Sequence, residues 1–147
     1  MIALVQRVLR AEVVIAGVCR GSIAHGLVVF VCAEPDDTEA LAEKFVAKLL
    51  KLRIFGDADG KMNRSVVDVN GGLLIISQFT LAADLSGGNR PSFTGAAAPD
   101  WGRLLYDRIV ASARSAHSQV ACGEFGAAMQ VSLVNDGPVT IPMRLRT

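Results

Sequence analysis

Four polar or aromatic residues follow directly after a short apolar run, and their types could do chemistry. The run is Leu73–Ile76, whose continuous apolar character predicts a strand buried on both faces. Ser77, Gln78, Phe79 and Thr80 come next. A core strand delivers such groups to its carboxyl end, where sites are commonly built. The alternative interpretation is a strand that ends in an ordinary polar turn, and this stretch alone does not decide between the two.

The hydroxyls of Ser77 and Thr80 and the amide of Gln78 have no acid or base near them in the sequence. A Ser-His-Asp triad would have to use His25 or His117, and the Gly-x-Ser-x-Gly pattern is absent. Hydroxyls and backbone amides can still position a labile ester and stabilise the charge that develops on its oxygen. The sequence therefore disfavours a conventional serine hydrolase and permits ester hydrolysis.

A second polar stretch lies near the other end of the chain, at 135–140, with the sequence Asn-Asp-Gly-Pro-Val-Thr. A Gly-Pro pair is an ordinary tight turn in most proteins, and a cis bond before proline is a minority conformation. The pattern alone therefore predicts a turn between two strands, 129–134 and 139–145.

Together the two stretches resemble the D-aminoacyl-tRNA deacylases, small enzymes that hydrolyse D-amino acids from mischarged tRNA. One family motif is matched by Ser77, Gln78 and Thr80, and a second, which holds a Gly–cisPro pair, by Gly137 and Pro138. The resemblance extends in order over the segments 1–8, 53–55, 60–63, 90–93 and 129–133.

The resemblance implies hydrolysis of the ester between a D-amino acid and the terminal adenosine of tRNA, without a metal or other cofactor. The catalytic residues would be Ser77, Gln78, Phe79 and Thr80. Thr80 would act either as nucleophile or by positioning, and we favour positioning, with the amides of Phe79 and Thr80 facing the developing charge. The neighbouring ribose hydroxyl would assist, which suits the missing general base.

The resemblance also implies a homodimer in which Gly137 and Pro138 of one subunit enter the site of the other. Their carbonyls would contact the α-amino group and α-carbon of the substrate, so that an L side chain collides with main chain. Such a filter would accept many D side chains, and glycine mischarged on tRNA(Ala) could also pass. Met129 would belong to this part of the site, and Arg7 would brace the Gly–Pro loop. Pattern alone leaves Arg7 as a charge on the exposed face of a strand.

The segment 86–92, Ser-Gly-Gly-Asn-Arg-Pro-Ser, is the most loop-like stretch of the chain and follows closely after Thr80. It could fold over the site, where Arg90 could meet a phosphate. By resemblance, Arg90, Ser92 and Phe93 would contact the 3′ end of tRNA. An ordinary surface loop is the alternative.

Hydrophobic periodicity predicts the elements that position these residues. Helices are expected at 37–51 and 100–116, with Trp101 in the core. Strands are expected at 1–10, 11–15, 18–23, 27–33, 52–55 and 119–121. The turn at 56–61 has neither the spacing of a P-loop nor the ligands of a calcium loop.

Composition narrows the class of protein. Of 147 residues, 51% are hydrophobic and 20% charged, which excludes disorder. The longest apolar run, 27–33, is too short to span a membrane, and 1–5 lacks the features of a signal peptide. Three widely spaced cysteines predict buried free thiols in a reducing cytoplasm, and two histidines give no metal cluster. A net charge of +1 restricts any RNA contact to a local one.

We therefore predict a single α/β domain over 1–147, with a twisted, barrel-like sheet and two main helices packed outside it. The expected location is cytoplasmic, and the expected partners are aminoacyl-tRNA and a second copy of the chain. Residues 141–147 resemble the family less, so the packing of the last strand is open. Two alternative functions remain: a non-catalytic module that binds the aminoacylated 3′ end of tRNA, and a hydrolase of other D-amino acid esters.

Overall fold

One long strand runs through the sheet and pairs with three others. In the computed structural model, which describes residues 1–147, β1 (Ile2–Ile15) pairs along one edge with β3 (Gly26–Cys32) and then with β2 (Val18–Ile23). Its other edge pairs with β8 (Gln130–Arg144). All three pairings are antiparallel. The predicted strands 11–15 and 18–23 are joined as a hairpin, whose turn has positive φ at Ala16 and Gly17.

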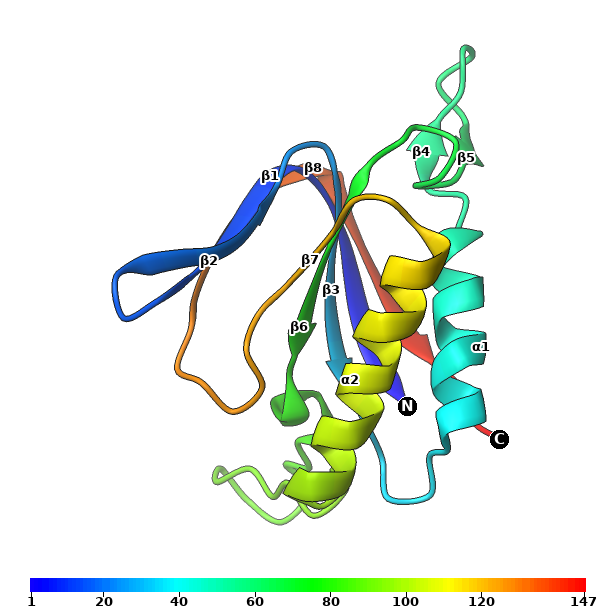
Figure 1. Cartoon of the computed structure of the whole chain (residues 1–147). Helices are drawn as coiled ribbons and strands as arrows, with labels where there is room; N and C mark the ends of the chain where they lie inside the picture. The colour runs from blue at the N-terminus through cyan, green and yellow to red at the C-terminus, as the bar shows by residue number, and fades with distance from the viewer.

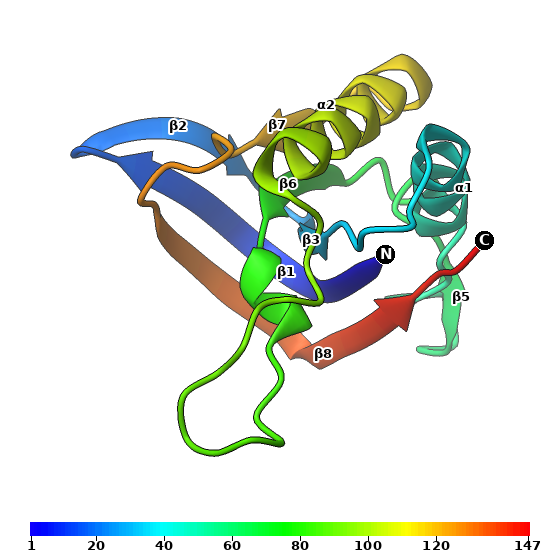
Figure 2. The same cartoon turned by 90° about the horizontal axis from the view of Figure 1, so that it is seen from below.

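The sheet continues beyond β3 through two parallel strands and then curls back on itself. β6 (Gly72–Ser77) pairs with β3, and β7 (Val120–Cys122) pairs with β6. The ends of the path β2-β1-β3-β6-β7 approach each other, because a Cβ on Gly21 of β2 would lie 3.0 Å from the Cys122 carbonyl. The predicted barrel-like sheet is thus present and nearly closed (Figure 2). A separate small hairpin is formed by β4 (Phe55–Gly56) and β5 (Met62–Arg64).

Two helices lie side by side against one face of the sheet (Figure 1). They are α1 (Glu39–Leu50) and α2 (Pro99–Ala116), and Arg108 of α2 forms ion pairs with Glu39 and Glu43 of α1. The N-cap of α1 is Thr38, whose hydroxyl accepts the Leu41 N–H at 3.2 Å. The second helix begins one residue before the predicted Asp100: Pro99 is its first helical residue, and Ala98 at the N-cap makes no side-chain hydrogen bond. Neither helix is long and apolar enough to cross a membrane.

β6 is buried on both faces, as its apolar run predicts. Leu73 and Ile75 belong to the large core between the sheet and the helices, whereas Leu74 and Ile76 belong to a smaller cluster inside the curl of the sheet. All four side chains are at most 1% exposed. Each contributes about 1.5–3 kcal/mol by leaving water, so β6 holds the two layers together.

Several expected boundaries differ in the structure. The segments 1–10 and 11–15 form one strand, and only Phe55 of 52–55 is in a strand. Residues 135–138 are not a turn between two strands. They are a bulge within β8, because both flanking segments pair with the same partner, β1, and the chain does not reverse.

Two further expectations concern the burial of the cysteines and the packing of the last strand. All three cysteines are free, but only Cys32 is buried: Cys122 is half-buried, and Cys19 is exposed because it lies on the edge strand β2. The last strand, whose packing the sequence left open, is well packed. It pairs with Ile2–Gln6, and Val139 and Met143 are buried.

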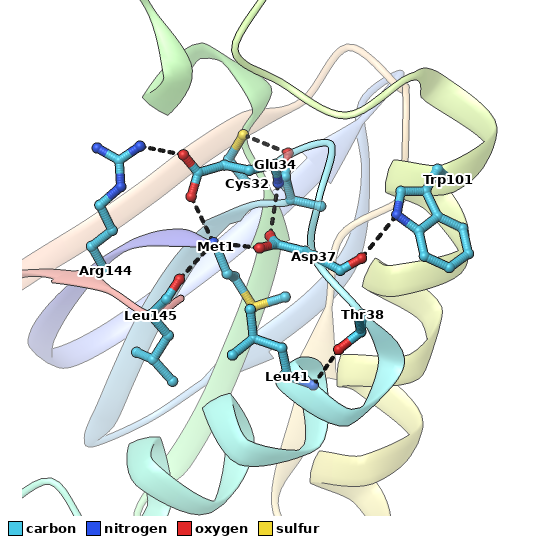
Figure 3. A network of polar contacts seen from close by, with 10 residues as sticks. Met1, Cys32, Glu34, Asp37, Thr38, Leu41, Trp101, Arg144 and Leu145 are labelled. Atoms are coloured by element: carbon cyan, nitrogen blue, oxygen red, sulfur yellow. Dashed lines mark hydrogen bonds and ion pairs between the residues drawn. The ribbon is translucent and has the colours of Figure 1, made fainter. Parts of the chain in front are cut away.

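The two ends of the chain meet in a polar network beside α1 (Figure 3). The buried ammonium group of Met1 donates to Glu34 at 2.7 Å, to Asp37 at 2.8 Å and to the Leu145 carbonyl at 2.8 Å. Arg144 donates to the other oxygen of Glu34. Partial burial alone would raise the pKa of Glu34, but the bonds from Met1 and Arg144 outweigh it and hold the pKa below its ordinary value.

This network predicts an acid-dependent loss of stability. A carboxyl whose pKa is lowered by folding stabilises the native state above its ordinary pKa of 4.5, and this contribution disappears as the pH falls through the lowered value. Glu34→Gln should therefore cost about 1–3 kcal/mol at pH 7 and flatten the decline between pH 5 and 3, as measured by urea unfolding. Glu43→Gln, in an exposed pair with Arg108, is the matched control and should cost at most about 1 kcal/mol. Parallel pH curves for wild type and Glu34→Gln would contradict this account.

Candidate active site

The polar residues after β6 fold into a single turn of 3-10 helix. The turn, η1, spans Phe79–Ala82. It is fixed to β3 by the Gln78 N–H, which donates to the Val31 carbonyl at 2.8 Å, and the Cys32 thiol lies within donating distance of the carbonyls of Ala33 and Phe79, at 3.3 and 3.6 Å. Burial raises the pKa of that thiol to about 11, so it stays protonated and acts as a donor. No side chain caps η1, and the N–H groups of Phe79 and Thr80 at its start are available to a ligand.

A hollow of about 610 Å³ opens beside this turn. Its floor is the end of β6, and its walls come from the segment before α2 and from the connection between β7 and β8. The lining residues are Ile76, Ser77, Gln78, Phe79, Phe93, Ala96, Ala97, Pro99, Phe125, Gly126, Ala127, Met129 and Val131.

No residue that lines this hollow has an ionisable side chain. Its polar side chains are the Ser77 hydroxyl and the Gln78 amide, and the rest of the lining is apolar or glycine. Such a site can orient a ligand and donate hydrogen bonds to a developing oxyanion, but its walls supply no general base. The hollow therefore suits a reaction that needs positioning more than proton transfer.

The structure brings together most of the residues that the sequence indicated near Ser77. Gln78, Phe79, Phe93 and Met129 line the same hollow, and the rings of Phe79 and Phe93 meet edge to face with centroids 5.1 Å apart. Thr80 is exposed at the rim, where its hydroxyl accepts a hydrogen bond from the Gln78 amide.

Arg90 and Ser92 lie on an exposed excursion beyond the hollow. The excursion is closed at its base by two backbone hydrogen bonds between Asp84 and Ser92, of 2.8 and 2.9 Å. The Arg90 side chain makes no hydrogen bond or ion pair, and neither residue lines the hollow. The segment thus begins beside Thr80, as expected, but it does not cover the site within this chain.

Three predicted site residues lie away from the hollow beside Ser77: Arg7, Gly137 and Pro138. Arg7 pairs with Leu27 of β3, and Ser77 pairs with Val31 of the same strand. The positions of Arg7 and Ser77 are therefore about 13 Å apart along β3. The strands β1 and β3 also separate β8 from β6. Within one chain, the Gly–Pro loop does not reach the hollow.

The Gly–Pro loop, residues 135–139, is held by side chains from both sides. Asn135 accepts the Val139 N–H at 2.7 Å and donates to the Val139 carbonyl at 3.2 Å, which closes the loop across its base. Arg7 donates to the carbonyls of Asp136 and Ile54, at 2.9 and 2.7 Å. The Gly137–Pro138 bond is cis, and both residues are exposed. Arg7 therefore points towards this loop, and its side chain is only 15% exposed.

Sequence reasoning missed the apolar wall of the hollow. Ala96, Ala97 and Phe125 carry no motif, and they reach Ser77 only because α2 and β7 pack beside β6. Tyr106 supports this wall from beneath: its hydroxyl donates to the Ile75 carbonyl at 2.9 Å, with the Gly123 carbonyl 3.3 Å from the same oxygen, and burial raises the Tyr106 pKa. In the sequence, a buried tyrosine on an amphipathic helix looks like any other core residue, so nothing marks it as a support of the site.

Comparisons with known proteins agree over the whole chain. Residues 4–144 match the family described as D-Tyr-tRNA(Tyr) deacylase. The chain is 66% identical to the D-aminoacyl-tRNA deacylase of Methylibium petroleiphilum, over 97% of this chain and 94% of that protein. It is also 66% identical to the one from Variovorax paradoxus, over 99% of both.

Two solved structures have the same fold. The c-Myc DNA Unwinding Element Binding Protein superposes with a TM-score of 0.94 and 37% identity over the full length of both chains. A probable eukaryotic D-amino acid tRNA deacylase superposes with a TM-score of 0.84 and 20% identity over 97% of both, which shows a common fold.

The position of Arg7 predicts that it stabilises the Gly–Pro loop. Arg7→Ala removes the donor to the Asp136 and Ile54 carbonyls and should cost about 1–3 kcal/mol. The amides of Gly137 and Val139 should then exchange faster with deuterium. Arg10→Ala, at an exposed position of the same strand, is the matched control. Equal exchange at residues 137–139 in both variants would count against the brace.

Proposed function

The chain belongs to the D-Tyr-tRNA(Tyr) deacylase family, hydrolases of the aminoacyl-tRNA ester bond, and we propose that it releases D-amino acids from tRNA in a hollow completed by a second copy of itself. In this proposal Ser77, Gln78, Phe79 and Thr80 hold the ester. Gly137 and Pro138 of the second copy test the configuration of the amino acid. The products are free D-amino acid and free tRNA, made in the cytoplasm where tRNA is charged.

The observation that carries this proposal is a mostly apolar hollow whose only polar side chains are a hydroxyl and an amide, with no ionisable side chain. An aminoacyl ester is more labile than a peptide amide, so its hydrolysis needs less activation of the attacking water. The free N–H groups of Phe79 and Thr80 can face the oxygen on which charge develops. One such donor lowers the activation barrier by about 2.7–4 kcal/mol. The ribose hydroxyl next to the ester then supplies the acid–base help that the walls lack.

The selection of D-amino acids requires a group that the chain's own hollow does not contain. Gly137 and Pro138 are exposed, rigidly supported and distant from Ser77 of the same chain. These features support a role across a dimer interface. Main-chain carbonyls from the loop would exclude an L side chain whatever its chemistry, whereas a D side chain or the hydrogen of glycine would fit.

The terminal nucleotide of tRNA would enter from the side of the exposed excursion 84–92. Its one basic residue, Arg90, is exposed and makes no side-chain contact within the chain, so it is free to meet a phosphate. The edge-to-face pair of Phe79 and Phe93 offers an apolar rim for the adenosine. A few contacts of this kind suit brief binding, in keeping with the net charge of +1.

The test is release of amino acid from matched D- and L-tyrosyl-tRNA by the purified protein, with Gly-tRNA(Ala) alongside. The proposal expects rapid release from the D substrate only, with glycine as the permitted exception. Folded dimer that binds but cleaves no substrate would instead support a module that binds the aminoacylated 3′ end. Undiminished activity on D-tyrosyl-adenosine would favour a general hydrolase of D-amino acid esters.

Thr80→Ala distinguishes a positioning role from a nucleophilic one. If the Thr80 hydroxyl, oriented by Gln78, only positions the substrate, its removal should lower kcat by at most about 10³-fold. Loss of a covalent nucleophile costs about 10⁶-fold. Single-turnover rates on D-tyrosyl-tRNA give the comparison, with Thr80→Ser as the control that keeps the hydroxyl. A loss near 10⁶-fold in Thr80→Ala would refute the positioning role.

Gly137→Ala tests the chiral filter. A Cβ at Gly137, whose φ is +154°, would lie 2.6 Å from the Val139 nitrogen and 2.7 Å from Val139 Cγ2, so the loop must move. The ratio of D to L hydrolysis should fall at least about tenfold, since misplacement by 1 Å can cost about 10²-fold. Gly87→Ala, at an exposed loop position with open space around it and no positive φ, is the control. An unchanged ratio in Gly137→Ala would remove the filter from the proposal.

A further inference from the structure

We propose that His25 is a positioning residue for the Gly–Pro loop and that its charge adjusts how strictly L-aminoacyl esters are rejected. The inference rests on the proposed role of Gly137 and Pro138 at the site of the second copy. His25 precedes β3, belongs to no motif of the chain and lies outside the hollow next to Ser77.

His25 faces the Gly–Pro loop across a second, mostly polar hollow of about 430 Å³. Its lining comes from four strands and the connections between them: Arg7, His25, Phe55, Gly56, Gly60, Arg64, Val69 and Asp136. The hollow therefore lies directly behind the residue that precedes Gly137.

The imidazole is held in place from two sides. Its Nε2 lies 3.9 Å from the carboxylate oxygen Oδ2 of Asp136. The ring also meets Phe55 edge to face, with centroids 5.1 Å apart and planes at 86°. The His25 carbonyl accepts the Gly72 N–H at 3.0 Å, which ties the backbone at this position to β6. The ring can thus change its charge without losing its place.

Asp136 is the link between His25 and the loop. Its carbonyl accepts from Arg7 Nε at 2.9 Å, while its Oδ2 lies 3.5 Å from the same nitrogen. The backbone of Asp136 is therefore fixed by Arg7, and its carboxylate is shared between Arg7 and His25. A cationic His25 adds a second attraction to the Asp136 carboxylate beside that of Arg7, which restrains Gly137 and Pro138 further.

The charged groups that face His25 are Asp136 from β8, Arg7 from β1 and Arg64 from β5. Both arginines keep their charge at all relevant pH values. Arg64 donates to the Asp68 carbonyl and makes no contact with Asp136. Imidazole is the side chain type whose charge can change between pH 5.5 and 8, so any dependence of the support of Asp136 on pH in this range is assigned to His25.

The consequence is a pH-dependent chiral ratio. The side chains of His25 and Asp136 are 46% and 38% exposed, and a pair of this exposure changes an equilibrium by about two- to fivefold. The ratio of D- to L-tyrosyl-tRNA hydrolysis should therefore be about two- to fivefold higher at pH 5.5 than at pH 8. Effects of pH on the lability of the ester act on both substrates and cancel in this ratio.

The experiment measures this ratio by single-turnover hydrolysis at pH 5.5, 6.5, 7.5 and 8 for the dimeric wild type and three variants. His25→Phe keeps a ring against Phe55 and removes the charge, so its ratio should be low and independent of pH. His25→Lys keeps a positive charge, and its ratio should be high and independent of pH. Arg64→Gln removes a neighbouring charge from the same hollow and should keep the pH dependence of the wild type.

The outcomes separate the inference from the proposed function. If Gly137→Ala lowers the ratio while His25→Phe leaves both its size and its pH dependence as in wild type, His25 has no such role. If Gly137→Ala leaves the ratio of D to L hydrolysis unchanged, the chiral filter of the proposed function is wrong, and the inference about His25 is wrong for the same reason. NMR gives a second measurement: the Gly137 amide shift should titrate together with the His25 ring and stop titrating in His25→Phe. A chemical shift of the Gly137 amide that does not change as the His25 ring titrates would overturn the proposal.

Discussion

The backbone pairing of β1 is the constraint on which the rest of the structure depends. Its antiparallel ladders join β3, β2 and β8, so the strand satisfies the buried backbone groups of both ends of the chain at once. Because β8 pairs with β1 over nearly its whole length, an extra stretch in β8 cannot become a turn and must bulge out of the ladder. The Gly–Pro loop is that bulge, and the residue of β1 beneath it is Arg7, whose guanidinium reaches the carbonyl of Asp136.

The same sheet fixes the candidate active site at a distance from that loop. β6 must stay apolar while it is buried on both faces, and it can present polar groups only where burial ends, at Ser77. The turn η1 then leaves the N–H groups of Phe79 and Thr80 without an intrachain cap. One end of the sheet thus holds groups that can bind an ester, and the other holds a supported loop that can read configuration. A second copy of the chain brings the two together in our proposal.

The chemistry of the hollow explains why selectivity and catalysis can be divided between two places. A hollow lined by apolar side chains, a hydroxyl and an amide has little with which to distinguish side chains. In the proposed function, configuration is read by rigid main chain, which requires strong support from behind. Arg7, Asn135 and Asp136 supply that support, and the contact of His25 with Asp136 adds a group whose charge depends on pH.

Elements whose signals are local could be predicted from the amino-acid sequence. The apolar run Leu73–Ile76, the helical stripes and the polar cluster at Ser77 were predictable because burial and periodicity are written within one segment. The family resemblance also predicted functional roles for Arg7 and Gly137, which stay predictions. Only the tertiary structure decided that 135–138 is a bulge, that Phe125 lines the hollow and that His25 faces Asp136. These features depend on which strands pair and in which register, and such pairings join residues more than a hundred positions apart.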